Sequence, residues 1–370
     1  MNFKLHKSHV AIIHDALMEF GGAERVLLDL LRLFPNAHIV TTAANQTVVD
    51  AFFSHIPKEN IHMLFGHTTF FERHNSLFHM MSPFWWGKVN LRDYDIILSI
   101  SAYKLANLVS TKSALHIQYV NSPPKNLFGL APYTPLQHVI PYTKPLAAYY
   151  SKKIRESNYV IANSRHIQSV LFHLFGIHSD VIYPPVTVPI TLPTRVKPRY
   201  YLCVSRIDDT KFLELPIRAC SILKAPLKIV GATNNPSYLR KLKNIAGPTV
   251  EFLGFRTDKE IASLYTAAHA FLFPSKEEDF GIAPVEALAH GVPVIAFAGG
   301  GVRETIIDDV TGKLFFTHTT KALISAIKRF ELSKFNPALL HRYAKTFGAG
   351  VFRKTMHAFI QNALTIRSNE

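Results

Sequence analysis

Short apolar runs alternate with helix-length segments along most of the chain, and this alternation constrains the fold more than any other feature. Two series of such runs are separated by a segment that holds five prolines between Pro184 and Pro198. Proline interrupts both helices and central strands, so we predict an interdomain linker there. The apolar runs lie at 10–13, 39–42, 96–100, 116–120, 159–162 and 181–183 before it, and at 200–204, 227–230, 250–253, 270–273 and 293–296 after it. Strands that alternate with helices form parallel sheets, so the sequence predicts two α/β domains.

The linker sets the expected domain boundaries. We predict a first domain over residues 1–188 and a second over 196–345. Residues 346–370 are predicted to form a C-terminal helix long enough to pack back on the first domain. Ligands of parallel α/β sheets bind at the carboxyl ends of the strands, in the loops that open helices. The residues of those loops are therefore the candidate functional residues.

Composition narrows the class of partner. The 370 residues are 48% hydrophobic and 18% charged, which is typical of a folded globular chain, and the net charge is +15. A positive balance favours phosphate groups, acidic lipid surfaces or nucleic acid, but the basic residues form no dense block, which argues against a nucleic-acid partner. With only two cysteines and no run of 18 apolar residues, a cytoplasmic protein is expected, either free or peripheral on the inner face of the membrane.

The sequence shows no convincing metal site. The 19 histidines are scattered without a ligand spacing such as His-Glu-x-x-His. Asp93-Tyr94-Asp95 has the spelling of a D-x-D metal motif, yet it directly precedes an apolar run that we expect to be a strand. We therefore predict that no metal and no bound cofactor take part.

The most informative segment runs from Ser275 to Glu286 and reads SKEEDFGIAPVE. It follows a predicted strand and is expected to open a helix, where Gly281 allows close approach of the backbone to a ligand and Pro284 suits the first turn. Free N–H groups at such a helix start bind anions. Glu278 in the loop and Glu286, about two turns into the helix, can then contact different parts of an extended sugar diphosphate. Taken alone, the two glutamates are also compatible with ordinary exposed charges.

The spacing of Glu278 and Glu286 resembles the E-x7-E motif of the retaining family 4 glycosyltransferases. Three further segments resemble motifs of this family, in the family's order: Gly21-Gly22-Ala23-Glu24-Arg25, Ser205-Arg206 with Lys211, and the glycine loop 299–305. Taken alone, the last of these is equally compatible with a plain turn between strand and helix. The resemblance implies a GT-B fold, in which two Rossmann-like domains with parallel sheets face a central cleft.

The resemblance also implies a role for each matching residue. Arg206 and Lys211 clamp the donor diphosphate, where paired cations stabilise the charge of the leaving group. Glu286 binds the ribose hydroxyls and Glu278 the hydroxyls of the donor sugar. Five backbone positions complete the donor site: Phe280, Gly281 and Ile282 near sugar and phosphate, with Gly21 and Gly22 approaching the diphosphate from the first domain on domain closure.

Residues 117–124 resemble a loop of a mannosyltransferase-like branch of the family, which usually reads His-Thr-Pro or His-Ser-Pro. Asn121 stands at the histidine position. Asparagine can hydrogen-bond a hydroxyl but cannot take up its proton, so we expect Asn121 to orient the acceptor. His116 should not substitute for the missing histidine, because it lies five residues away in a predicted strand. In retaining enzymes of this family the leaving phosphate is thought to accept the proton, so this replacement does not exclude catalysis.

Aromatic residues gather between Met63 and Trp86, with Arg73 and Lys88 close by. They are Phe65, Phe70, Phe71, Phe78, Phe84, Trp85 and Trp86. Such a stretch suits an anionic membrane interface, which fits a lipid-linked acceptor, and it is equally compatible with the aromatic core face of a helix pair.

These observations predict a metal-independent, retaining hexosyltransferase. Its donor is a nucleoside diphosphate sugar, with GDP-mannose favoured by the 117–124 loop, and its acceptor is a saccharide or lipid-linked saccharide of a surface glycan. A sugar-nucleotide epimerase on the same double-Rossmann fold and a catalytically degenerate donor-binding protein remain alternatives.

Overall fold

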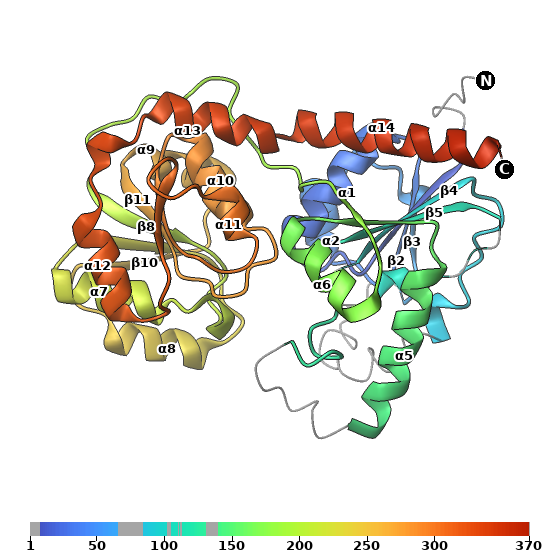
Figure 1. The fold of residues 1–370 in the computed structure, drawn as a ribbon, viewed down its shortest axis with the longest axis horizontal. Coiled ribbons are helices and arrows are strands. Elements are labelled where there is room, and N and C mark those ends of the chain that lie inside the picture. Colours follow the sequence, from blue (N-terminus) through green and yellow to red (C-terminus); the bar gives the residue numbers. More distant parts are fainter. Residues whose placement is uncertain are drawn as a thin grey trace. The chain divides into compact units, whose positions relative to one another are not determined.

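The computed structural model describes residues 8–65, 84–101, 105–109, 111, 113–130 and 140–369. The chain divides into two compact units (Figure 1). Unit 1 comprises Met1–Pro185 and Phe352–Glu370, and unit 2 comprises Val186–Val351. The proline-rich segment 184–198 contains no helix and no named strand, as its composition predicts.

Within the described residues, unit 1 contains a parallel sheet of seven strands in the order β3-β2-β1-β4-β5-β6-β7. The strands are β1 (Val10–His14), β2 (His38–Thr41), β3 (Ile61–Met63), β4 (Ile96–Ser101), β5 (Leu115–Val120), β6 (Tyr159–Ala162) and β7 (Asp180–Val181). Its helices are α1 (Gly22–Leu33), α2 (Gln46–Phe52), α5 (Ile140–Glu156) and α6 (Arg165–Phe175), with short 3-10 turns at Lys58–Asn60 and Ala106–Leu108. Every residue of β1, β4 and β5 is buried, which explains their mostly apolar sequences.

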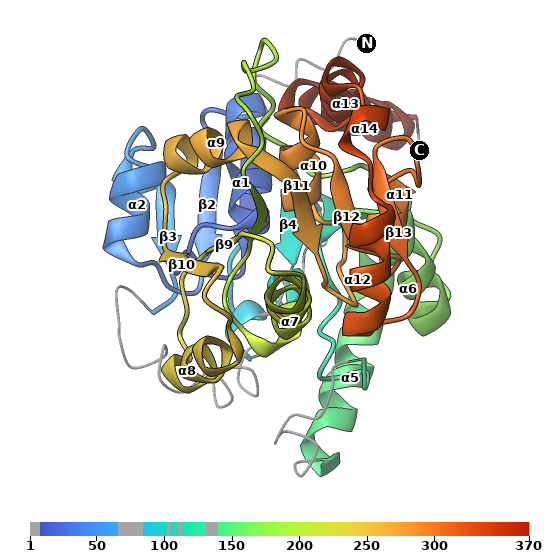
Figure 2. The same cartoon turned by 90° about the vertical axis from the view of Figure 1, so that its left-hand side faces the viewer.

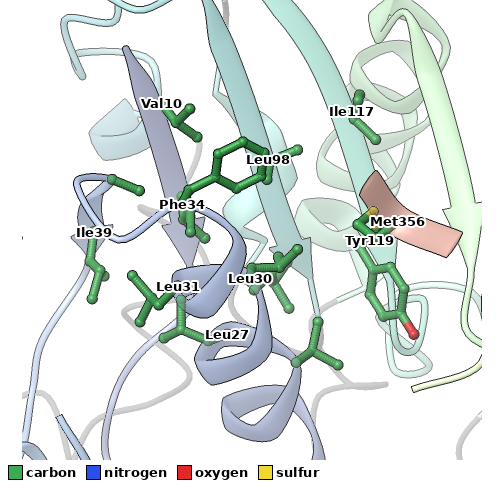
Figure 3. Packing of buried hydrophobic residues seen from close by; sticks show 14 of the residues in the cluster. Val10, Leu27, Leu30, Leu31, Phe34, Ile39, Leu98, Ile117, Tyr119 and Met356 are labelled. Carbon is green, nitrogen blue, oxygen red and sulfur yellow. The ribbon is translucent and has the colours of Figure 1, made fainter. Parts of the chain in front are cut away.

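The packing of α1 on this sheet follows from its apolar spacing. Leu27, Leu30 and Leu31 recur on one face of the helix and pack with strand residues such as Ile39 and Leu98 (Figure 3). Arg32 and the buried Asp29 of the same helix form an ion pair of 3.1 Å.

The C-terminal helix α14 (Ala349–Ser368) contributes to the same core. Phe352, Met356, Ile360 and Leu364, spaced four residues apart, are all buried there. The ring of Phe352 meets Tyr119 of β5 edge to face with 6.0 Å between centroids, and Met356 lies beside Tyr119 (Figure 3). Arg353 adds an ion pair with Asp29 of α1. From Phe352 onward the chain therefore completes the hydrophobic core of unit 1, although it follows unit 2 in sequence.

Unit 2 contains a parallel sheet of six strands in the order β10-β9-β8-β11-β12-β13. The strands are β8 (Tyr200–Val204), β9 (Leu227–Val230), β10 (Val250–Gly254), β11 (Ala268–Phe273), β12 (Val294–Phe297) and β13 (Gly312–Phe315). The helices are α7 (Glu214–Leu223), α8 (Pro236–Ile245), α9 (Asp258–Thr266), α10 (Ile282–Ala289), α11 (Val302–Thr305), α12 (Thr320–Arg329) and α13 (Pro337–Ala344). Figure 2 shows α7 beside α12. The predicted fold class, α/β with two Rossmann-like domains, is confirmed.

Each sheet reverses its strand order once, between β1 and β4 in unit 1 and between β8 and β11 in unit 2. Ligands of open parallel sheets bind in the crevice outside the carboxyl ends of the strands at such a switch point. The topology therefore directs attention to the loops after these four strands. None of the helices within the described residues is long and apolar enough to span a bilayer.

We predict that α14 stabilises unit 1 through its buried face. Ile360→Ala removes a fully buried side chain from the shared core and should lower the free energy of unfolding by about 2–4 kcal/mol. Gln361→Ala, one residue along on the exposed side of the helix, is the matched control and should change it by less than about 0.5 kcal/mol. Urea unfolding measures both, and equal effects of the two substitutions would contradict this assignment.

Candidate active site

The loops after β8 and β11 meet at the switch point of unit 2. They line a small hollow, whose walls are Cys203, Val204, Ser205, Lys211, Leu213, Leu272, Phe273, Pro274 and Ser275. Cys203, Val204, Leu272 and Phe273 of this lining belong to β8 and β11, whereas Ser205, Lys211 and Ser275 bring polar groups to the hollow. A mostly apolar lining with a few polar groups at a switch point is the arrangement expected of a ligand site in this class of sheet.

Lys211 and Glu278 form an ion pair at this point. The Lys211 ammonium lies 2.9 Å from Glu278 Oε2, and each side chain is 21% exposed. The hydroxyl of Ser275 donates to the same carboxylate oxygen at 3.1 Å. Two residues that are 67 apart in sequence are thus brought together, as expected if both serve one site.

Arg206 lies on the same loop after β8 but has a different carboxylate neighbour. Its Nε is 3.6 Å from Asp208 Oδ2, and its side chain is 52% exposed. Asp208 also accepts the backbone N–H of Thr210 at 3.0 Å, which starts the short 3-10 turn that carries Lys211. Each of the two predicted clamp cations therefore lies near a carboxylate of its own.

Glu286 lies closer to the helix start than the sequence led us to expect. It is the fifth residue of α10, about one turn from its start at Ile282, rather than about two. The helix begins at Ile282, because Gly281 supplies the left-handed conformation (φ 90°) that turns the loop into it. Pro284 occupies the first turn as predicted, the Glu286 side chain is half-buried, and the side chain of Phe280 is buried against Phe347.

The glycine loop 299–301 packs against the backbone of the Glu278 loop. The Gly301 N–H donates to the Glu278 carbonyl at 2.8 Å, and Gly300 has a left-handed φ of 56°. A β-carbon at Gly300 would lie 2.2 Å from the same carbonyl oxygen, which no side chain tolerates. These glycines are therefore more than a plain turn, because they permit the close approach that holds the Glu278 loop in place.

In unit 1, the predicted glycine loop forms the start of α1. Gly22 is the first helical residue, and the Gly21 N–H donates to Glu24 Oε2 at 2.9 Å. Glu24 is buried, and this burial raises the pKa of its carboxyl to about 7. The fully buried His14 at the end of β1 has its Nε2 3.5 Å from Glu24 Oε1, and burial lowers its pKa to about 4.

Asn121 follows β5 directly, at the carboxyl edge of the sheet of unit 1. Its N–H donates to the Ser101 carbonyl at 2.9 Å, and its own carbonyl accepts the Asn163 side-chain amide at 2.9 Å. The side-chain Nδ2 of Asn121 is buried without a hydrogen-bond partner among the described residues. His116 is buried inside β5, where its Nε2 lies 2.9 Å from the Ser99 hydroxyl.

The D-x-D spelling at Asp93-Tyr94-Asp95 lies directly before β4, as expected from the sequence. Within the described residues, no cluster of three or more His, Cys, Asp or Glu side chains is arranged to hold a metal ion. Asp95 instead accepts the backbone N–H of His9 at 2.8 Å.

Most of the aromatic stretch 63–86 lies outside the described residues, including Phe70, Phe71, Arg73 and Phe78. Of its last residues Trp86 is buried, whereas Phe84 is 55% exposed and carries the Lys88 ammonium 3.9 Å from its ring centroid.

Sequence reasoning gave no separate role to Glu24 and none to His14. The signal for Glu24 was present, because a glutamate three residues after a helix N-cap is the spacing of a capping box. The partner at His14 is supplied by the sheet, and no local pattern indicates it.

The two parallel sheets and the loops after β8 and β11 define an α/β protein with two Rossmann-like units. Residues 191–347 match the family described as glycosyl transferases group 1. The resemblance stated from its motifs is confirmed for this part of the chain. D-inositol 3-phosphate glycosyltransferases are among the relatives. That of Xylanimonas cellulosilytica is 30% identical, and the match covers 39% of this chain and 38% of that protein. That of Mycobacteroides abscessus is 31% identical, and the match covers 40% of this chain and 38% of that protein. The chain thus spans about two fifths of the length of these curated relatives.

Solved structures share the fold over almost the whole chain. Sucrose-phosphate synthase from Thermosynechococcus elongatus aligns with a TM-score of 0.72 at 18% identity, covering 97% of this chain and 100% of the other. The Anabaena protein HepE, solved in complex with UDP and glucose, aligns with a TM-score of 0.70 at 20% identity, covering 95% and 98%. The catalytic domain of starch synthase IV from Arabidopsis thaliana, bound to ADP and acarbose, aligns with a TM-score of 0.65 at 13% identity, covering 97% of this chain and 99% of the other. These likenesses confirm the predicted GT-B class of fold.

We predict that the backbone contact at Gly300 is required for the site to form. Gly300→Ala combines a left-handed φ with a clash against the Glu278 carbonyl, and should lower the free energy of unfolding by about 2 kcal/mol or more. Gly254→Ala is the matched control, because its φ is +69° but no atom lies within 4 Å of the added carbon. It should cost only about 1 kcal/mol, the strain of the backbone conformation alone. Urea unfolding distinguishes the two, and equal losses would show that the packing of the two loops is unimportant.

Proposed function

We propose that this protein is a retaining hexosyltransferase that uses a nucleoside diphosphate sugar. The observation that carries the proposal is the ion pair of Lys211 and Glu278 at the β8/β11 switch point, within a segment that matches the group 1 glycosyl transferases. The ligands named for the solved structures of similar fold, UDP with glucose and ADP with acarbose, are consistent with such a donor.

The ion pair suggests how the donor is received. Lys211 and Glu278 form an ion pair at a partly exposed position. A diphosphate attracts the ammonium of Lys211 more strongly than one carboxylate does, because it carries more charge and more acceptor oxygens. Its arrival would release Glu278 to accept hydrogen bonds from the sugar hydroxyls, while Ser275 holds the carboxylate in position.

The remaining donor contacts follow from the loops around this pair. Arg206 on the loop after β8 supplies a second cation, and the first-turn N–H groups at Gly281 and Ile282 of α10 supply donors for the phosphates. These groups would stabilise the charge that develops on the leaving diphosphate, without a metal ion or bound cofactor in our proposal. Glu286, one turn along the helix, would bind the ribose, and the backbone of Phe280 would lie near the sugar.

The acceptor is proposed to be a saccharide or lipid-linked saccharide in surface-glycan synthesis, bound on the side of unit 1. Asn121 presents a buried, unpaired amide nitrogen at the carboxyl edge of that sheet, which suits a hydroxyl acceptor. A peripheral position on an anionic, cytoplasmic membrane face is proposed on the basis of the net charge of +15. Mannose from GDP-mannose is the preferred donor, on the likeness of the 117–124 loop alone.

We predict selective binding of one nucleotide series. In a thermal-shift panel of GDP, UDP, ADP and their common sugar conjugates, with EDTA throughout, one base should raise the melting temperature of the wild type. Arg206→Ala with Glu286→Ala should abolish this shift, because the phosphate and ribose contacts are lost. Arg329→Ala, which removes an exposed cation from the last turn of α12, is the control and should keep it. If millimolar nucleotide shifts nothing, the donor assignment is wrong.

We predict that Asn121→His does not reduce transfer. The leaving phosphate is proposed to take the acceptor proton, so a residue at this position needs only to orient the acceptor. Rates of nucleotide release measured with acceptor present should be equal to those of the wild type or higher. A loss of tenfold or more would show that the amide of Asn121 has a role that imidazole cannot fill.

Product analysis separates the alternatives. An epimerase would isomerise the nucleotide sugar without releasing nucleoside diphosphate, and a degenerate binding protein would bind the nucleotide without turnover whatever acceptor is offered.

A further inference from the structure

The start of α1 contains a buried acid and a buried base in contact. Glu24 Oε1 lies 3.5 Å from His14 Nε2, and Glu24 Oε2 accepts the Gly21 N–H at 2.9 Å. Glu24 is 7% exposed and His14 is 1% exposed. Neither ring nitrogen of His14 has a hydrogen-bond partner among the described residues. A single proton between Glu24 Oε1 and His14 Nε2 is enough to link the two side chains by a hydrogen bond.

The surroundings disfavour a charged pair. Besides His14, the titratable groups that act on Glu24 are Asp15, which follows His14 at the end of β1, and Glu19 of the loop that leads to α1. Both are acidic, so a second carboxylate at Glu24 would add negative charge to a buried acidic region. Burial acts in the same direction and favours the uncharged forms, raising the pKa of Glu24 and lowering that of His14. A neutral Glu24 can donate its proton to His14 Nε2 while its other oxygen still accepts the Gly21 N–H.

We propose that Glu24 and His14 form a neutral, proton-sharing pair that positions the Gly21–Gly22 loop and keeps negative charge away from it, so that the start of α1 can take an anionic diphosphate. This inference rests on the proposed function, because the family resemblance that motivates that function also implies that Gly21 and Gly22 approach the donor diphosphate. Because Glu24 uses the N–H of Gly21, the N–H groups of Gly22 and Ala23 in the first turn remain to meet the ligand. Glu24 is thus a positioning residue that acts through the loop.

Ionisation of Glu24 would place a full negative charge beneath this loop. Binding of nucleoside diphosphate should therefore weaken as the pH rises through the pKa of Glu24, which is about 7. Glu24→Gln keeps both hydrogen bonds without an ionisable group. The ratio of the wild-type to the Glu24→Gln dissociation constant should rise about tenfold between pH 6 and pH 8.5, the effect of a like charge a few ångströms away in a medium of intermediate dielectric.

The same pair also predicts a pH dependence of the free energy of unfolding, which can be measured without a ligand. Folded Glu24 binds more protons than unfolded Glu24 between pH 4.5 and about 7, so its contribution to the free energy of unfolding falls as the pH rises through that window. His14 contributes in the opposite sense, because burial lowers its folded pKa to about 4, below the ordinary histidine value of about 6.5. Replacing Glu24 removes only the first effect. The melting temperature of Glu24→Gln relative to wild type should therefore rise by about 5 °C from pH 5 to pH 8.

The matched control is the capping box of α9, where Glu260 accepts the Thr257 N–H at 2.8 Å in the same geometry. Glu260 is exposed and its pKa is lowered by these hydrogen bonds, so Glu260→Gln should not gain stability relative to wild type between pH 5 and pH 8.

The test measures dissociation constants of UDP, GDP and ADP by calorimetry at pH 6, 7 and 8.5 for wild type, Glu24→Gln and Glu260→Gln, together with melting temperatures over the same range. Support consists of the pH-dependent ratio and the relative gain in stability, both confined to Glu24→Gln. If the wild type binds a nucleotide but the ratio or the stability difference is independent of pH, the inference is wrong and the proposed function stands. If the wild type binds no nucleotide at any pH, the proposed function fails, and the role of the pair toward a diphosphate fails with it.

Discussion

The close approach of the 299–301 backbone to the Glu278 carbonyl is the constraint on which the site in unit 2 depends. Only glycine fits there, because a β-carbon at Gly300 would overlap the carbonyl oxygen. The contact holds the loop after β11 by its backbone, and the Glu278 side chain then meets Lys211 from the loop after β8. The ion pair across the switch point is thus a consequence of loop packing, which explains how a partly exposed acidic loop can have one defined arrangement.

The two units differ in how a functional carboxyl group is kept from adding net negative charge to its site. In unit 2 a partly exposed cation and carboxylate neutralise each other, and either can change partner when an anionic ligand arrives. In unit 1 the buried acid and base avoid charge altogether, and the burial of both groups is the physical reason. We propose that the two arrangements serve one purpose, which is to leave cations and backbone N–H groups as the groups that a diphosphate meets.

Much of the fold could be predicted from the sequence, because a buried parallel strand has a short, mostly apolar sequence. The runs at 96–100 and 200–204 became β4 and β8 within a residue. The short strands β3 and β13 were missed, since Ile61–Met63 and Gly312–Phe315 contain polar residues or glycine and are only partly buried. The start of α10 was also misplaced, because the left-handed Gly281 and not the apolar pattern determines where that helix begins.

The candidate site was less accessible to sequence reasoning. Motif order indicated the loops, yet nothing in the sequence could show that Lys211 contacts Glu278 while Arg206 lies by Asp208, because these pairings depend on the conformation of each loop. The contact of Glu24 with His14 joins a helix to a strand and leaves no local signature. The roles of these residues toward a ligand, the retention of configuration and the absence of a metal requirement stay predictions.

The most direct test of the central claim is the configuration of the product. The wild-type protein is incubated in EDTA with the nucleotide sugar of the series that it binds and a panel of saccharide and lipid-linked acceptors, and the new glycosidic bond is followed by proton NMR as it forms. Our account predicts release of nucleoside diphosphate in step with a glycoside that keeps the anomeric configuration of the donor. Inversion of that configuration, or isomerisation of the nucleotide sugar without release of nucleoside diphosphate, would contradict it.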